Sequence, residues 1–324
     1  MQKDKAKKKL QEHPDVFADI FNNLVFFGRE FVNPSELTLI PTASRHSDAK
    51  GELRERTRDI LMQDNRSAVL YLLLGLENQD YIDNTMPLRC MGYDFAAYDK
   101  QVKDYMDENR QKGNSAYLRK IHKEQKLAPV ITLVTYYGQE EWDAPKDIYE
   151  MLNMPDEWKQ GENTFIHNYP MNFVHRGKLP GEVRERFTSD VRLLVEYLAC
   201  RDDLEKLKKL TMDMNQKISH PEDLLDALST VADKRYLEIK DVIINKPEKE
   251  ELTMCVLVDE LEKTGKAKGK AEDIIDLLEE CDTVPEWLKN HIMQETDVDK
   301  LKALLKLSAK VESIEEFIKK SGMK

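Results

Sequence analysis

Residues 68–79, AVLYLLLGLENQ, form a nearly continuous apolar run that ends in Glu77, Asn78 and Gln79. A strand that enters a protein core normally stops at a turn residue such as Gly, Pro or Asn-Gly. This run continues instead into a carboxylate and an amide. Because successive side chains of a strand alternate between faces, Glu77 and Gln79 share one face. The segment therefore predicts a buried strand with polar side chains at its end.

The segments around this strand predict an α/β (α+β) fold. Residues 58–63, RDILMQ, and the polar residues 64–67, DNRS, precede the strand, and together the three segments are typical of a β-hairpin. The remaining expected elements, in chain order, are a helix over 15–32, an extended segment over 37–47, a helix over 89–106 and a buried strand over 128–138. This order favours a core with a mixed sheet.

The C-terminal part of the chain has a different pattern. Helical periodicity recurs from about residue 201 onwards, and strand patterns are absent there. Pro247 and the segment 263–270, KTGKAKGK, are expected to be joints between helices. The sequence therefore predicts an α/β domain over 1–200 and an all-helical C-terminal region over 201–324.

Composition excludes several classes of protein. The net charge of the 324 residues is −11, which argues against a passive nucleic-acid coat protein but leaves a carboxylate-bearing nuclease open. The four cysteines form no C-x-x-C pair, so neither a disulfide framework nor a zinc site is expected. No apolar run approaches the roughly 20 residues of a membrane span, and the lysine-rich start has no apolar segment behind it. We expect a cytoplasmic protein with no membrane partner.

Polar residues at the end of the hairpin are suited to holding a hard metal ion. Mg²⁺ prefers oxygen ligands and takes few protein groups, which makes Glu77 and Asp59 on the preceding strand candidate ligands. A three-residue loop would pair Asp59 with Leu73 and leave roughly 13 Å between Asp59 and Glu77, at about 3.3 Å per residue. A bulge or wider loop must shorten that gap, or Glu55 takes part instead. The alternative is that these are ordinary solvated strand ends.

Three longer segments resemble a known family: RERTRDI at 54–60, LGLENQDYIDNTMPLRCMGYDFAAY at 74–98 and APVITLVTYYGQEEWDAP at 128–145. They are similar to the Rpn-type recombination-promoting nucleases, also classed as YhgA-like transposases, of the PD-(D/E)XK nuclease superfamily. The resemblance extends from PDVFADIFNNLVFFG near the start to CVLVDELEKTGKAKGKAEDI and covers most of the chain.

The resemblance implies a restriction-endonuclease-like core, DNA as substrate, and Mg²⁺ or Mn²⁺ as cofactor. By position, Asp59 matches the isolated aspartate of the motif, Glu77 its second acid, and Gln79 the position that is commonly lysine. Lysine would supply positive charge to the transition state, whereas glutamine can only hydrogen-bond the attacking water. Arg89 and Tyr93 fall on the helix after the motif.

The sequence offers further candidate site residues at Asp19, Arg89 and Lys120. Asp19 could contribute an additional acid or lie on a solvated helical face. Arg89 could contact phosphate or form an ion pair with Asp83 or Asp94. Lys120 belongs to a weak basic patch that could contact DNA.

The sequence leaves the activity itself open. The main hypothesis is a metal-dependent DNA endonuclease, which could act as a homodimer. The alternatives are a catalytically weak or inactive nuclease fold that binds DNA or protein, and a nuclease that acts on RNA.

Overall fold

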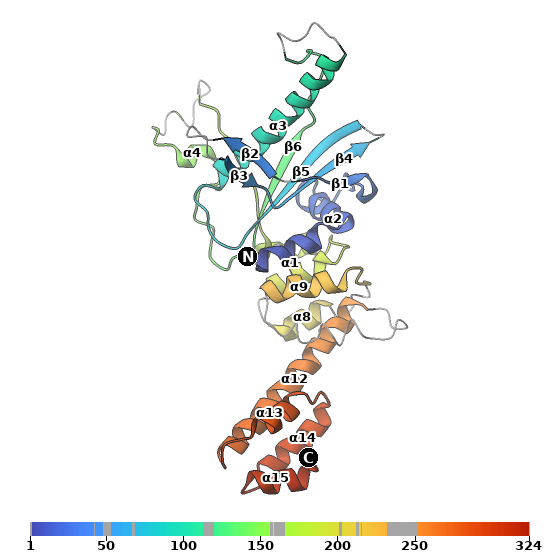
Figure 1. The fold of residues 1–324 in the computed structure, drawn as a ribbon, viewed down its shortest axis with the longest axis vertical. Coiled ribbons are helices and arrows are strands. Elements are labelled where there is room, and N and C mark those ends of the chain that lie inside the picture. The colour runs from blue at the N-terminus through green and yellow to red at the C-terminus, as the bar shows by residue number, and fades with distance from the viewer. Residues whose placement is uncertain are drawn as a thin grey trace. The chain divides into compact units, whose positions relative to one another are not determined.

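Five strands form the main sheet in the computed structural model of the protein (Figure 1). Their order is β1-β4-β5-β6-β7, where β5 is antiparallel to β4 and parallel to β6. The bounds are β1 Leu37–Leu39, β4 Ile60–Arg66, β5 Val69–Gln79, β6 Val130–Tyr136 and β7 Asn172–His175. A separate two-stranded sheet pairs β2 (Ala43–Ser47) with β3 (Leu53–Thr57). The mixed sheet predicted from the sequence is confirmed.

The structure describes residues 2–41, 43–47, 53–66, 69–112, 120–155, 158, 166–200, 203–211, 214, 216–231 and 252–323. The chain divides into two compact units, Met1–Arg201 and Asp202–Lys324. Each unit is described by itself.

Helices flank the sheet in the first unit. They are α1 (Gln2–Gln11), α2 (Pro14–Leu24), α3 (Met86–Gln111), α4 (Ile148–Met151), α6 (Gly181–Arg184) and α7 (Val191–Cys200), with 3₁₀ turns η1 (Pro34–Glu36) and η3 (Arg176–Lys178). The helix expected over 15–32 is shorter than predicted. It ends at Leu24 because Phe27 and Gly28 adopt left-handed backbone angles, with φ of 56° and 86°.

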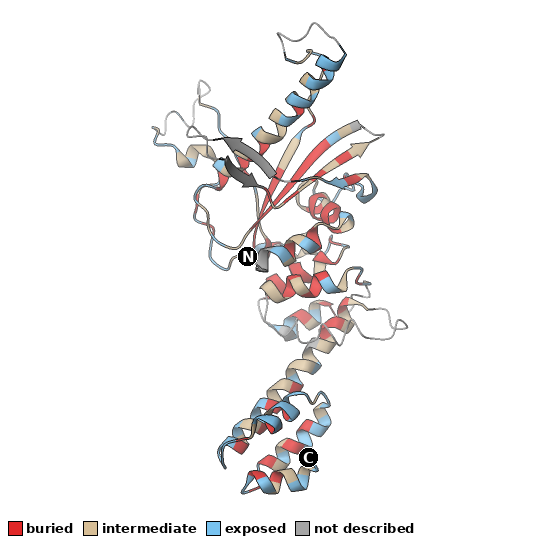
Figure 2. Ribbon diagram, viewed as in Figure 1, coloured by how far each residue is buried: buried red, intermediate tan, exposed pale blue. Residues whose placement is uncertain are grey.

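The buried core of this unit lies on β5, β6 and α2 (Figure 2). The helix α3 covers one face of the sheet, since Met86, Cys90 and Tyr93 pack in one cluster with Val134 and Tyr136 of β6. The spacing of the α3 residues is that of one helical face. On the opposite face, α1 reaches the strand ends, where Gln11 donates a hydrogen bond of 2.7 Å to the Tyr137 hydroxyl.

One extra residue in β5 sets the register of the hairpin. Arg66 pairs with Val69, but Asp64 pairs with Leu72, so Tyr71 is bulged. Continued without the bulge, the first register would place Asp59 opposite Leu76. The shift instead pairs Ile60 with Leu76, which brings Asp59 level with Glu77. The expected pairing of Asp59 with Leu73 is wrong. The observed turn, in which Arg66 pairs with Val69, shifts the register by three of the four missing residues, and the bulge adds the fourth.

Contacts with a distant loop hold the bulge. The guanidinium of Arg66 lies 4.0 Å from the centre of the Tyr71 ring and 4.6 Å from that of Phe31. Its Nη2 also donates a hydrogen bond of 2.8 Å to the Phe31 carbonyl. The contacts of Arg66 with the Tyr71 ring and with Phe31 therefore hold the bulged residue near the segment between α2 and η1.

The second unit is helical in the part that the structure describes. Its helices are α8 (Leu204–Thr211), α9 (Pro221–Val231), α12 (Met254–Glu279), α13 (Glu286–Met293), α14 (Val298–Ser308) and α15 (Ile314–Ser321). The last four share a core that includes Ala271, Leu288, Leu301 and Phe317.

The predicted joint at 263–270 is wrong, because these residues continue α12 without a break. Lysine and alanine are good helix formers, and Lys266 pairs with Glu262 one turn earlier. The other expected joint, Pro247, falls outside the described residues. Among the helices that are described, none is both long and apolar enough to cross a membrane.

Candidate active site

Glu77 lies near the C-terminal end of β5, on the face that α3 covers. Its exposed fraction is only 2%. The strand places it there because the alternation along β5 directs Leu73, Gly75 and Glu77 to the same face. The alternative of a solvated strand end does not describe Glu77, which is enclosed and hydrogen-bonded.

Asp59 is joined to Glu77 by two reciprocal hydrogen bonds. The Asp59 backbone N–H donates to Glu77 Oε2 at 3.2 Å. In return, Asp59 Oδ2 accepts from the Asn78 backbone N–H at 2.8 Å. Each carboxylate is therefore fixed by the backbone of the other strand, and the two predicted acids lie together.

Three side chains converge on the other oxygen of Glu77. Arg89 Nη2 forms a short ion pair with Oε1, Gln79 Nε2 donates to it at 3.2 Å, and the Tyr93 hydroxyl does so at 3.4 Å. Arg89 and Tyr93 are one turn apart on α3, which puts both on the face toward β5. Arg89 Nη2 also donates to the Tyr93 hydroxyl at 3.0 Å.

Asp83 anchors the second side of the Arg89 guanidinium. Its Oδ2 accepts from Arg89 Nη1 at 2.7 Å, while its Oδ1 accepts from the backbone and hydroxyl of Thr85 at 2.8 and 2.7 Å. The Thr85 bonds form the turn that leads into α3. The ion pair of Arg89 with Asp83 that the sequence suggested is present, whereas Asp94 pairs with a different arginine.

The pKa of the Glu77 carboxyl lies near neutral pH. Burial raises its pKa to about 7, and the Asp59 charge acts in the same direction. Arg89 and the donated hydrogen bonds oppose this rise without cancelling it. Burial and the Glu77 charge also raise the pKa of Tyr93 to about 12, so its hydroxyl stays a proton donor. A further cation beside Glu77 and Asp59 would favour the ionised form.

Three other predicted residues are not brought to this group by any contact described. The Asp19 carboxylate is buried elsewhere, where Oδ2 accepts from the backbone of Thr188 and from the backbone and hydroxyl of Ser189, at 2.6–3.0 Å. Glu55 lies on β3 opposite Arg45, and its side chain is outside the description. Lys120 is exposed in the loop before β6.

Asn78 also belongs to the site, although the sequence did not identify it as a candidate. Its side chain points to the opposite face, where Nδ2 donates to Gln11 Oε1 at 2.7 Å and Oδ1 accepts from Thr135 Oγ1 at 2.9 Å. These bonds tie the end of β5 to α1 and β6. Strand alternation between Glu77 and Gln79 was the signal that could have identified it.

Two carboxylates at this site are the groups that could hold a hard divalent cation. The Asp59 and Glu77 carboxylates are the charged donors. Because the N–H and C=O of a strand residue face the same neighbour, the Asn78 carbonyl lies on the Asp59 side. Across the described residues, no group of three or more His, Cys, Asp and Glu side chains could hold a metal. Mg²⁺ commonly uses one or two carboxylates, so this donor set suits it.

Residues 4–225 match the family described as "Putative transposase, YhgA-like". The chain belongs to this family. The match includes the whole hairpin, α3 and β6, and thus every residue of the group around Glu77. It ends within α9, before α12 to α15. No curated protein and no solved structure matches the chain.

Proposed function

We propose that the protein is a metal-dependent DNA endonuclease that hydrolyses phosphodiester bonds at the end of β5. The observation that carries this proposal is the reciprocal bonding of two carboxylates, one of them buried with a pKa raised to about 7. Perturbed, paired acids are typical of functional sites. Membership of a transposase family agrees with chemistry on DNA.

Asp59, Glu77 and the Asn78 carbonyl would hold Mg²⁺ or Mn²⁺. When bound, such an ion lowers the pKa of water and offsets negative charge on the phosphate. The chain supplies the remaining functions. Gln79, which donates to Glu77 Oε1 at 3.2 Å, is placed to hydrogen-bond the attacking water.

Binding of a metal ion by Glu77 would require the Arg89 side chain to move. Its guanidinium neutralises Glu77 and stays bound to Asp83 through its other nitrogen. A cation at Glu77 would release Nη2, while Asp83 and Tyr93 keep the side chain beside the site. The released Nη2 could then donate a charge-assisted hydrogen bond to a phosphate oxygen.

A plasmid-nicking assay on the purified protein tests the proposal. We expect nicking with Mg²⁺ or Mn²⁺, none with EDTA, and a loss of about 100-fold or more in Asp59→Asn and Glu77→Gln. Asp104→Asn is the matched control, because Asp104 is exposed on α3 and is 63% accessible. Equal nicking by all four proteins would contradict the assignment of the site.

A non-catalytic DNA-binding or protein-binding role is the second candidate. The Arg89–Glu77 ion pair favours it, since the arginine already supplies the cation that the two acids require. Gln79 in place of lysine points the same way. This reading predicts DNA binding without nicking at any metal concentration, and equal binding by wild type and Glu77→Gln.

A further inference from the structure

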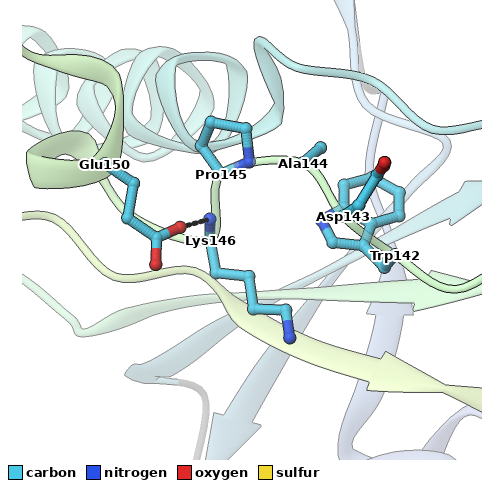
Figure 3. A pocket seen from close by; sticks show the side chains of 6 residues that line it. All are labelled: Trp142, Asp143, Ala144, Pro145, Lys146 and Glu150. Carbon is cyan, nitrogen blue, oxygen red and sulfur yellow. Dashed lines mark hydrogen bonds between the residues drawn. The ribbon is translucent and has the colours of Figure 1, made fainter.

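The first unit has a pocket of about 410 Å³ beside the loop that follows β6 (Figure 3). The cation in its lining, Lys146, lies among the exposed carboxylates of Asp143 and Glu150. The indole N–H of Trp142 is buried and has no acceptor among the described residues. Because its charges are balanced in this way, the lining does not select one class of ligand.

The turn that follows α2 has a more definite chemical character. It spans residues 25–31, VFFGREF, and we call it the aromatic turn. The Phe26 ring stacks on Phe31 with 4.5 Å between centroids, and Phe31 is followed by Tyr71 of β5 at 6.1 Å. Phe31 and Tyr71 are 37% and 45% exposed. Neighbouring rings that are open to solvent form a surface on which further planar groups can stack.

Phe27 is the most exposed ring of the aromatic turn. Its exposed fraction is 80%, and its backbone is left-handed, with φ of 56°. A bulky residue rarely adopts this conformation, because its Cβ crowds the following backbone. The chain therefore holds a strained backbone that leaves an apolar ring in solvent. Strain of this kind is typical of binding sites.

Three arginines lie on or against the aromatic turn. The Arg66 guanidinium lies over two of its rings, and Arg29 is exposed within the turn. Arg186 Nη1 donates to the Phe27 carbonyl at 3.4 Å, and a Cβ at Gly28 would lie 3.1 Å from Arg186 Cδ. Arginine beside exposed rings is the combination that binds both phosphates and bases.

The acids of this region are fewer than the arginines. Among the described residues, the acids that belong to the turn or pair with these arginines are Glu30 and Asp64. Asp64 is buried beneath Arg66, whose side chain is 38% exposed. The surface therefore presents positive charge on a chain whose net charge is −11. Such a local excess favours an anionic partner.

We propose that the aromatic turn is a stacking site for single-stranded DNA. Unpaired bases would stack on the exposed rings, while Arg29 and Arg186 bind the phosphates. A duplex fits less well, because its bases are covered by their neighbours in the stack. No base preference is expected, since every base has a flat face. The inference rests on the proposed function in taking DNA as the partner.

This site is separate from the proposed cleavage centre. Tyr71 precedes Glu77 by six residues of β5, which is about 20 Å at about 3.3 Å per residue. A strand held at the aromatic turn would therefore leave the carboxylates of the cleavage centre accessible. Binding at the turn and cleavage at Glu77 can be measured independently.

Fluorescence anisotropy of a labelled oligothymidylate of about 20 nucleotides tests the inference, in EDTA so that no cleavage takes place. We expect Phe27→Gly to weaken binding by about tenfold, because it removes a stacking ring. The same substitution should not lower the melting temperature, since glycine accepts the left-handed backbone. Phe27→Tyr keeps the ring and should retain the affinity.

The salt dependence of binding tests the part of the arginines. Arg29→Gln and Arg186→Gln should each reduce the slope of log affinity against log salt concentration by about 0.7, as the loss of one phosphate contact does for a single strand. Trp287→Ala and Arg110→Gln are the matched controls, because these side chains are exposed elsewhere, at 44% for Trp287 and 63% for Arg110. Both controls should keep the affinity and the slope of wild type.

Three results would overturn the inference: no binding of the oligothymidylate by wild type, equal affinity for a duplex of the same length, or unchanged binding in Phe27→Gly. If Phe27→Gly fails to fold, the salt slopes of the two arginine variants decide alone. Single-strand binding that depends on Phe27, without nicking in any metal, would refute only the nuclease proposal. Metal-dependent nicking without such binding would refute only the stacking site.

Discussion

Two acid–arginine pairs lie between α3 and the sheet, and they differ in the solvent exposure of the arginine. Asp94 of α3 binds Arg58 at 2.8 Å, with side-chain exposures of 11% and 3%. Glu77 of β5 binds Arg89 of α3, where the arginine is 33% exposed. The ring of Tyr93 lies against both guanidinium groups, at 5.3 Å from Arg58 and 5.9 Å from Arg89. One pair is closed on all sides, and the other opens to solvent on its arginine side.

The partners of the two acids explain the difference. Asp94 also accepts from the hydroxyls of Thr132 and Tyr169, so its bonds join α3, β6 and the loop before β7. Such a pair fixes a helix on a sheet and cannot exchange its cation. Arg89 is 33% exposed and is also bound by Asp83, so the Glu77 pair is the one at which we expect another cation to enter. Burial of the arginine therefore distinguishes the two pairs, and only the open pair belongs to the proposed cleavage centre.

The largest effect is expected from breaking the closed pair. Asp94→Ala leaves the Arg58 charge buried without its partner, and we expect a loss of about 3–5 kcal/mol in the free energy of unfolding. Urea denaturation followed by circular dichroism measures it. Asp104→Ala on the exposed face of α3 is the control, with an expected change below about 0.5 kcal/mol. Equal effects of the two substitutions would remove the distinction between the pairs.

A pH-dependent gain in stability is expected at the open pair. Because the Glu77 pKa is raised from 4.5 to about 7, the folded state binds the proton more tightly than the unfolded state. Stability is therefore highest below about pH 4.5 and falls as the pH rises to about 7. Glu77→Gln should be more stable than wild type by about 2–3 kcal/mol at about pH 8, with a gain that vanishes toward about pH 5. Melting temperatures across that range, without metal, measure it. A gain independent of pH would contradict the raised pKa.

Gly75 provides a sharper test of the closed pair. A Cβ there would lie 2.5 Å from Arg58 Cδ, since the arginine crosses β5 at this residue. We expect Gly75→Ala to destabilise by about 1–3 kcal/mol, as overpacking does. In the Arg58→Met background the same substitution should cost less, so a double-mutant cycle in urea denaturation should show coupling. Additive effects would mean that Arg58 does not hold this position.

The smallest effect concerns the residue beside the open pair. If Gln79 only orients water, Gln79→Lys should raise the metal-dependent nicking rate by about tenfold, because it adds positive charge near the phosphate. Gln79→Ala should lower the rate by a similar factor. Initial rates of plasmid nicking measure both. An unchanged rate in both variants would exclude Gln79 from the reaction.

The hairpin shows what the sequence could and could not predict. The apolar run in β5, its end in polar residues and the mixed sheet follow from local periodicity. The register does not, because Tyr71 bulges through contacts of Arg66 with Phe31, far away in sequence. The placement of Asp59 beside Glu77 depended on that residue and on where the chain turns between β4 and β5.

Networks of side-chain contacts also could not be predicted from the sequence. The choice of Arg89 between Asp83 and Asp94 depended on Arg58, whose pairing with Asp94 spans two elements. Trp142 gave no signal in the sequence, since its unpartnered N–H exists only in the packed loop. In α12, by contrast, local propensity was sufficient, and two glycines were given too much weight as breakers.

Manganese binding followed by electron paramagnetic resonance tests whether Asp59 and Glu77 hold a divalent ion, because it reports the ion and not the reaction. We predict one Mn²⁺ site per chain in wild type and in Asp104→Asn. That site should be lost in Asp59→Asn and in Glu77→Gln, since each removes one of the two carboxylates that would hold the ion. The same Mn²⁺ binding in all four proteins would contradict the assignment of the two carboxylates as metal ligands, and Arg89 would then be the cation that neutralises Glu77.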